Sequence, residues 1–143
     1  MKPKFEFLEH VADAYVAARG QSLEEAFENA ALAMFDVMTD TQKVESTVKD
    51  EVIIEEYDQK ALLYSWLEQL LLKFEIEGKL YSKFEVSELL QTNKGWRLHA
   101  TIFGERFDLA KHVSKAEVKA VTYHQMEINR EDDGYLLRFI LDL

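Results

Sequence analysis

The chain has 143 residues, no cysteine, and 27 acidic against 17 basic side chains, for a formal net charge of −10. The absence of cysteine excludes disulfides, thiolate metal sites and cysteine nucleophiles. The acidic balance argues against tight direct binding of nucleic acid, which needs basic residues that displace phosphate counterions, and it favours docking onto a basic protein.

Length and composition predict one globular domain over residues 1–143. Hydrophobic residues make up 48% of the chain, and nine Phe, six Tyr and two Trp are enough to build a core. The segment from Met1 to Glu6 lacks the apolar stretch of a signal peptide, and no segment reaches membrane-spanning length. We therefore expect a cytoplasmic protein without membrane contact.

The first predicted elements are two strands and an amphipathic helix. Phe5 and Phe7 alternate with charged residues, and a second strand is expected over 14–17. The helix is expected over about 22–38, where Ser22 and Glu25 have the spacing of a capping box. Its apolar residues recur at steps of three and four: Leu23, Ala26, Phe27, Ala30, Ala31, Met34, Phe35 and Met38.

A short buried strand at 52–54 precedes a second amphipathic helix, expected over about 58–76. Asp58 is its candidate N-cap, and Gly78 marks the chain reversal after it. The apolar stripe again follows helical spacing: Leu62, Leu63, Trp66, Leu67, Leu70, Leu71 and Phe74. Both stripes are interpreted as core.

The remaining residues predict two hairpins. Strands around 81–86 and 96–102 are joined by the turn signal Asn93-Lys94-Gly95, and segments 118–128 and 135–143 are joined across Asp132-Asp133-Gly134. The order of elements indicates an α+β fold in which mixed or antiparallel sheet layers pack with the two helices.

Two acidic residues at opposite ends of the chain are candidate ligands for a cation. Asp142 and the terminal carboxylate of Leu143 end the last predicted strand, and Asp13 lies among apolar residues at the start of the second. Oxygen donors of this kind suit Ca²⁺ or Mg²⁺ rather than zinc. From the sequence pattern alone, carboxylates that simply face water are more common than carboxylates that bind a cation.

Lys119, His10 and His124 are the other candidate functional residues. Lys119 lies in an apolar strand-like segment followed by Thr122-Tyr123-His124, where it can balance carboxylates, contact a partner's acidic group or extend from a strand edge. A histidine titrates near neutrality, although a structural histidine is commoner. The sequence contains no phosphate-binding glycine loop, no HExxH motif and no serine in a nucleophile-elbow context, so we expect no catalytic residue and no cofactor site.

In order and spacing, several segments resemble the archease family over nearly the whole chain. They are His10-Val11-Ala12-Asp13, 20–27, 34–38, Val44-Glu45, 62–68, Gly104-Glu105 with Asp108 and His112, 117–124 and Asp142-Leu143. Two residues depart from the family pattern: Val11 stands where threonine is common, and Leu143 where isoleucine is common.

The resemblance implies a function that composition does not reveal. Archeases activate the RtcB-type tRNA-splicing RNA ligase by promoting its GTP-dependent guanylylation and multiple turnover, without being the ligase. The resemblance also implies a divalent-cation site, with calcium favoured over magnesium, formed by Asp13, Asp142 and Leu143, and a functional lysine at Lys119. Alternatives are a chaperone-like modulator of another tRNA enzyme, such as a methyltransferase, and an independent metal-dependent hydrolase.

Overall fold

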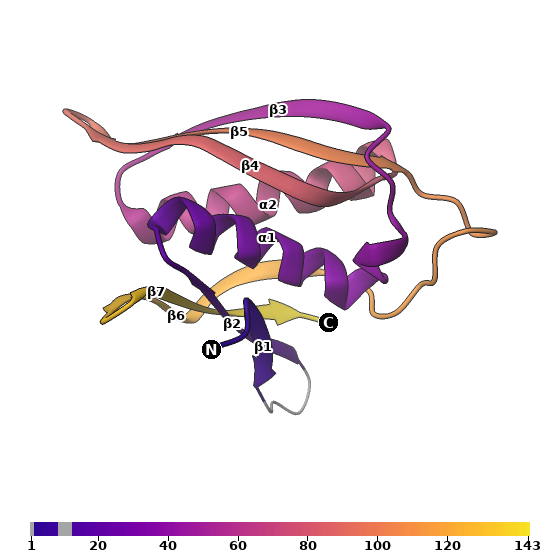
Figure 1. Ribbon diagram of the computed structural model, residues 1–143, viewed down its shortest axis with the longest axis horizontal. Helices are drawn as coiled ribbons and strands as arrows, with labels where there is room; N and C mark the ends of the chain where they lie inside the picture. The colour runs from indigo at the N-terminus through magenta and orange to yellow at the C-terminus, as the bar shows by residue number, and fades with distance from the viewer. Residues whose placement is uncertain (1, 9–12) are drawn as a thin grey trace.

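Two antiparallel sheets enclose a layer of two helices in the computed structural model, which describes residues 2–8 and 13–143 (Figure 1). In chain order the elements are β1 Phe5–Leu8, β2 Asp13–Gly20, α1 Leu23–Met38, a 3₁₀ turn Thr41–Lys43, β3 Val48–Glu56, α2 Gln59–Glu77, β4 Lys79–Thr92, β5 Gly95–Arg106, β6 Ala120–Glu131 and β7 Gly134–Asp142. The α+β fold predicted from the sequence is confirmed, and every strand pair in the described residues is antiparallel.

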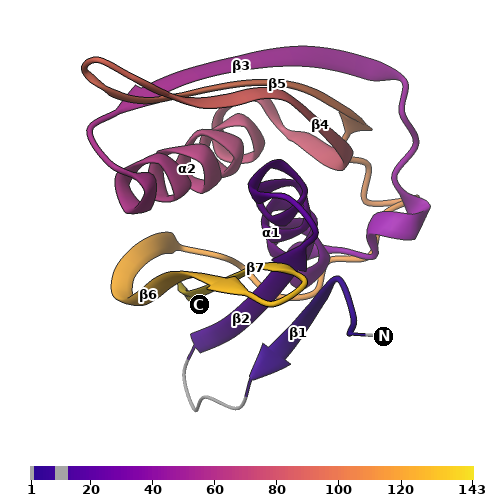
Figure 2. The same ribbon diagram turned by 60° about the vertical axis from the view of Figure 1, so that its left-hand side comes forward.

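The two sheets are built from different parts of the chain. One has the strand order β1-β2-β7-β6, so that β2, the second strand of the chain, and β7, the last, lie side by side at its centre. The other has the order β3-β5-β4. Figure 2 shows α1 and α2 between these layers, where each helix contacts both sheets.

Local capping fixes where α1 begins. The hydroxyl of Ser22 accepts a hydrogen bond from the Glu25 amide at 3.1 Å. The Glu25 carboxylate accepts from the amide of Gln21, at 2.7 Å, rather than from the amide of Ser22 that an ideal capping box would use. The predicted start of the helix is confirmed. The only difference from an ideal capping box is that the Glu25 carboxylate bonds to the amide of the residue before the N-cap.

The second helix has the predicted caps. The Asp58 carboxylate accepts from the Ala61 amide at 2.8 Å, and Gly78 has φ of 68°, a left-handed conformation that glycine adopts without steric cost. The buried residues of α2 are Ala61 and the predicted stripe except Phe74, which is only partly buried. No helix in the described part of the chain is long and apolar enough to cross a membrane.

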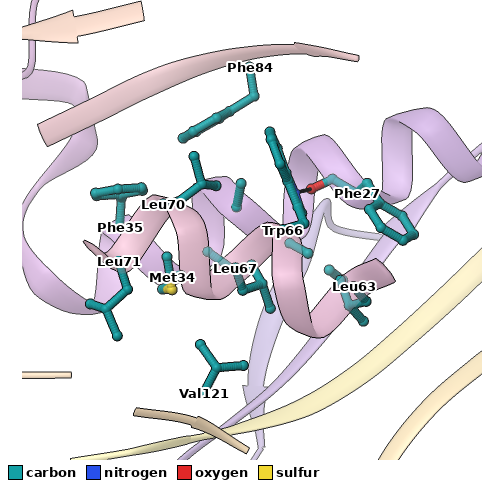
Figure 3. Close-up of a cluster of buried hydrophobic side chains, with 14 of the residues drawn as sticks. Phe27, Met34, Phe35, Leu63, Trp66, Leu67, Leu70, Leu71, Phe84 and Val121 are labelled. Carbon is teal, nitrogen blue, oxygen red and sulfur yellow. Dashed lines mark hydrogen bonds between the residues drawn. The ribbon is translucent and has the colours of Figure 1, made fainter. Parts of the chain in front are cut away.

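The core lies between the helices and extends to both sheets (Figure 3). Trp66 of α2 is fully buried, its ring packs edge-on against Phe84 of β4, and its indole N–H donates to the Phe27 carbonyl oxygen at 3.0 Å. Phe35 of α1 contacts the same Phe84 ring. These contacts join α1, α2 and the β3-β5-β4 sheet in one apolar cluster.

Both predicted hairpins are confirmed, but β6 contains an irregularity that the sequence reading missed. Gly95 and Gly134 adopt φ of 147° and 152° at the two turns. Thr122 pairs with Ile140 and Glu127 pairs with Arg138. Between these two pairs the chain advances five residues along β6 but only two along β7. The three extra residues form a wide bulge on the edge strand of the sheet.

Candidate functional site

The two candidate acidic ligands are direct partners in the sheet. Asp13, the first residue of β2, pairs in register with Asp142, the last residue of β7. Directly opposite residues on antiparallel strands have Cβ atoms about 4.5–5.5 Å apart. Strands β2 and β7 thus bring together residues separated by nearly the whole chain, at the end of the sheet where β7 stops.

Lys119 reaches the same end of the sheet from the other side. Its amide donates to the carbonyl oxygen of Asp142 at 2.7 Å, immediately before β6 begins at Ala120. Ala120 is itself the register partner of Asp142 on β6. Lys119 therefore lies just outside β6, which starts two residues later than predicted, and its side chain is exposed to solvent.

The donor set at this end consists of hard oxygen atoms. Asp142 is exposed, Asp13 is half-buried, and Leu143 packs partly against the core beside them. Among residues 2–8 and 13–143, no three His, Cys, Asp or Glu side chains gather closely enough to hold a metal. The candidate ligands are therefore the carboxylates of the two aspartates and an oxygen of Leu143, and oxygen ligands of this kind suit Ca²⁺ or Mg²⁺.

The two histidines of the predicted site have different outcomes. His10 lies outside the described residues, so its predicted role stays a prediction. His124 lies in the β6 bulge, where it is exposed together with Tyr123 and Gln125. The bulge begins beyond Thr122, which pairs with Ile140, two residues before Asp142 on β7.

A cavity of about 380 Å³ opens beside Lys119, which the sequence reading did not foresee. Its walls come from segments far apart in the chain, including Met38 at the end of α1, Phe74 near the end of α2 and Phe107 after β5. The rings of Phe74 and Phe107 pack edge to face, with centroids 5.9 Å apart. The cavity thus combines apolar walls with three charged lining residues, Glu75, Glu117 and Lys119.

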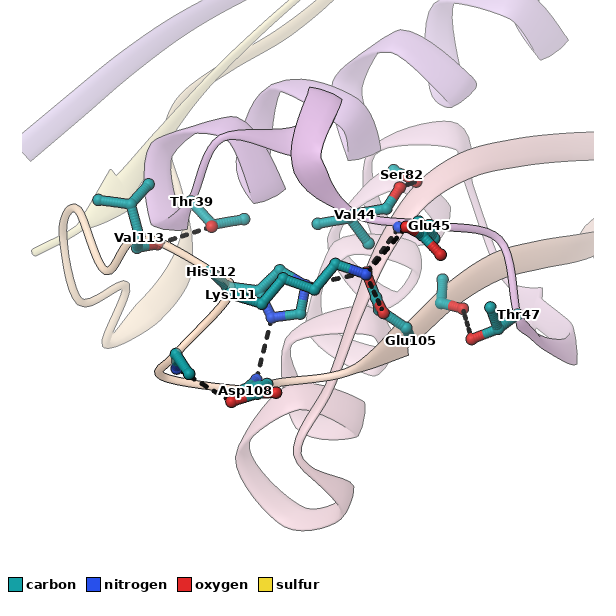
Figure 4. A network of polar contacts seen from close by, with 12 residues as sticks. Thr39, Val44, Glu45, Thr47, Ser82, Glu105, Asp108, Lys111, His112 and Val113 are labelled. Atoms are coloured by element: carbon teal, nitrogen blue, oxygen red, sulfur yellow. Dashed lines mark hydrogen bonds and ion pairs between the residues drawn. The ribbon is translucent and has the colours of Figure 1, made fainter.

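A polar network fixes the segment 107–119 that leads into Lys119 (Figure 4). The buried His112 accepts a hydrogen bond at Nδ1 from the Asp108 amide, at 2.9 Å. Its Nε2 then carries the proton and donates to the Glu105 carboxylate, also at 2.9 Å. Lys111 and the Glu45 amide donate to the same carboxylate at 2.9 and 2.7 Å. Glu105 and His112 are thus positioned to hold this loop in place.

The environment of Glu105 favours its charged form. Partial burial on its own would raise the pKa of this carboxyl, but the hydrogen bonds from Glu45, Lys111 and His112 outweigh that effect and lower the pKa to about 2. A carboxyl whose pKa falls on folding stabilises the protein above its unfolded pKa of 4.5, and it loses that contribution as the pH falls towards 2.

We expect Glu105→Gln to lower the free energy of unfolding at pH 7 by about 1–3 kcal/mol, because the hydrogen bonds that the charged carboxylate accepts are weakened or lost. The difference from the unmodified protein should shrink between pH 4.5 and pH 2, because there the carboxyl of the unfolded chain is protonated while that of the folded protein is still charged. Urea unfolding at pH 7 and pH 3 measures both values. Glu85→Gln, at an exposed position on β4, is the control. An equal difference at both pH values would show that the Glu105 charge contributes nothing.

Comparison with known proteins gives one family. The family model of the archease protein family matches residues 5–143. The proteins named archease from Sulfurisphaera tokodaii and Thermococcus gammatolerans are 47% and 46% identical over 140 and 141 residues. Each of these alignments covers 98% of this chain and 99% of the relative.

Solved structures agree with these matches. The solution structure of Methanobacterium thermoautotrophicum protein 1598 aligns with a TM-score of 0.86 and 47% identity, covering 98% of this chain and 99% of that one. A crystal structure from Thermotoga maritima, described as an archease and possible chaperone, has a TM-score of 0.63 and 19% identity over 100% of this chain and 97% of its own. That second likeness shows the fold alone.

The fold is thus that of a single-layer helix pair between two antiparallel sheets, with two aspartates opposed at the end of the central strands. The chain belongs to the archease family, as its sequence motifs predicted.

Proposed function

We propose that this protein is a non-catalytic activator of an RtcB-type RNA ligase in tRNA splicing, which promotes guanylylation of the ligase by GTP and allows it to turn over repeatedly. The observation that carries the proposal is the pairing of Asp13 with Asp142 at one end of the sheet, with Lys119 beside them. The family membership supports the choice of partner. The proposal keeps the cytoplasmic location expected from the sequence.

The paired aspartates are proposed to hold a divalent cation. Like charges directly opposite on neighbouring strands repel each other, and a cation between them would turn that repulsion into attraction. An oxygen of Leu143 is proposed as the third protein donor. Calcium is favoured because it accepts irregular sets of oxygen ligands, whereas magnesium demands near-octahedral geometry.

A bound cation would supply positive charge for phosphate oxygens at the partner's active site. The residues of this chain supply the rest of the proposed interaction. The exposed Asp142 and the net charge of −10 favour approach to a basic, RNA-binding surface. The exposed ammonium of Lys119 is proposed to contact an acidic or phosphate group of the complex, so that the acidic end docks in one orientation.

Several hydroxyl groups are already used in structural bonds, which supports a non-catalytic role. Ser22 caps α1, and Ser65 donates to the Glu56 carboxylate at 2.7 Å. Ser82 and Ser87 donate to the backbone carbonyl oxygens of Val44 and His99. The backbone carbonyl oxygens that accept from Ser82 and Ser87 cannot act as the general base that a serine nucleophile requires.

The test is RNA ligation with the ligase limiting and GTP in excess. We expect the amount of sealed RNA to exceed the amount of ligase several-fold when this protein is added, and to stay near one equivalent without it. The protein alone should seal no RNA. Sealing that stops at one equivalent in the presence of the protein would contradict the proposed activation.

We expect a short extension beyond Leu143 to weaken the stimulation more than the same extension before Met1. The added residues would place extra chain where Asp142 is proposed to enter the partner. The two tagged proteins should unfold at the same temperature, because Leu143 remains in place in both. Equal stimulation by both proteins would contradict the proposed approach of the Asp142 end of the sheet to the partner.

A further inference from the structure

The bulge in β6 is a strained feature on an exposed edge strand. Between the pairs Thr122–Ile140 and Glu127–Arg138, β6 has three residues more than β7, and the strand arches outwards there (Figure 2). Gln125 has φ of 57°, in the left-handed region that costs a non-glycine residue about 1 kcal/mol or more. Such strain persists where the surrounding structure maintains it, and it is concentrated at functional surfaces.

The bulge places an aromatic side chain on the surface of α2. Tyr123 lies flat against Tyr64 of α2, with ring centroids 4.4 Å apart and planes 5° apart, while Met126 is buried and anchors the far side of the bulge. Tyr123 remains 49% exposed, and Tyr57, at the end of β3, is 72% exposed. We call Tyr57, Tyr64 and Tyr123 the tyrosine platform.

Carboxylates surround the tyrosine platform. Burial is the main cause that raises the pKa of the Tyr123 phenol, and the neighbouring Tyr57, Glu56 and Asp58 raise it further. A hydrogen bond with Glu68 is the main cause that raises the pKa of Tyr64. Glu56 and Asp58 therefore lie near the phenol of Tyr123, and Glu68 lies beside that of Tyr64. Glu56 is held in place by the hydroxyl of Ser65, which donates to it at 2.7 Å.

We propose that the tyrosine platform binds an arginine side chain of a protein partner. A guanidinium stacks on aromatic faces, is drawn to their negative π-surface and forms forked hydrogen bonds with carboxylates. The exposed ring of Tyr123 supplies the face, and Glu56 and Asp58 supply the charge. A nucleic-acid base would also stack on tyrosine, but its phosphates would be repelled by the same carboxylates.

The position of the platform links it to the acidic end of the sheet. The bulge starts after Thr122, whose partner Ile140 is two residues before Asp142. Two residues of a strand span about 7 Å. One partner surface can therefore contact the tyrosine platform and the Asp13–Asp142 end together. That this partner is the ligase rests on the proposed function, whereas recognition of arginine does not.

The first test is an NMR titration of the full chain with N-acetyl-argininamide, followed through the tyrosine ring signals. We expect saturable shifts of the Tyr57, Tyr64 and Tyr123 signals, and binding weakened about tenfold by Tyr123→Ala but little by Tyr123→Phe. Phe7→Ala, at an aromatic residue that is 50% exposed on the opposite edge strand β1, is the matched control and should leave binding unchanged.

Three results with the unmodified protein would overturn the proposal. They are the absence of saturable shifts at the platform, equal shifts with N-acetyl-lysinamide, and stronger shifts with a nucleoside monophosphate, which would indicate a nucleic-acid base as the ligand. Unchanged binding by Tyr123→Ala would equally exclude the platform.

The second test uses the ligase and separates this inference from the proposed function. In multiple-turnover ligation, Tyr123→Ala should raise the concentration of this protein needed for half-maximal stimulation by about tenfold and leave the maximum unchanged. Asp142→Asn should lower the maximum instead. An unchanged half-maximal concentration for Tyr123→Ala would show that the tyrosine platform does not contact the ligase. A lack of stimulation by the unmodified protein would instead contradict the proposed function. Arginine binding would then be decided by the NMR titration alone.

Discussion

Asp13→Asn and Asp142→Asn should each weaken calcium binding by about 100-fold or more. Loss of a residue that only orients a metal ligand commonly costs 10–100-fold, and these residues are proposed as ligands themselves. Isothermal titration with Ca²⁺ measures the affinity. In the unmodified protein Ca²⁺ should also raise the unfolding temperature, because a ligand that binds only the folded state stabilises it.

The matched control for these variants is Asp133→Asn. Asp133 is an exposed aspartate in the turn between β6 and β7, at the opposite end of β7 from Asp142. It removes the same charge from the same hairpin and should leave calcium affinity unchanged. If Asp142→Asn bound calcium as tightly as Asp133→Asn, the cation would lie elsewhere and the ligand assignment would be wrong.

Trp66→Ala should destabilise the protein by about 3–5 kcal/mol, the usual cost of removing a large buried aromatic side chain. The ring is fully buried between the helices and β4, and its N–H donates to the Phe27 carbonyl oxygen. Many single domains have a total stability of only 5–15 kcal/mol, so this variant should unfold at a much lower urea concentration.

Ile76→Ala is the control on the same helix. Ile76 is 77% exposed, and its replacement should change the free energy of unfolding by no more than about 0.5 kcal/mol. Urea unfolding followed by circular dichroism measures both variants, because it does not depend on tryptophan fluorescence. Similar midpoints for Trp66→Ala and Ile76→Ala would contradict the placement of Trp66 in the core.

The helices and turns could be predicted from the sequence because the interactions that define them are local. Ser22 and Asp58 begin helices and Gly78 ends one through bonds within a few residues, and the two turns contain glycine at positions with positive φ. The strand order could not be predicted in this way. The pairing of β2 with β7 joins residues about 130 positions apart, which no local pattern encodes.

The candidate site was predictable only in part. Asp13 and Asp142 were singled out as ligands, and their pairing in the sheet places them together. The bulge was missed, although its signal is present: Val121 and Met126 are both buried but five residues apart, which an unbroken strand would place on opposite faces. The contact of His112 with Glu105 depends on a loop conformation that spacing alone does not determine.

The most direct test of the central claim is the rate at which the ligase becomes guanylylated by labelled GTP. The unmodified protein should accelerate this step, and the Asp13→Asn, Asp142→Asn double variant, folded as judged by its unfolding temperature, should not. Asp133→Asn should accelerate it as the unmodified protein does. Equal acceleration by the double variant would show that the carboxylate end of the sheet is not what activates the ligase.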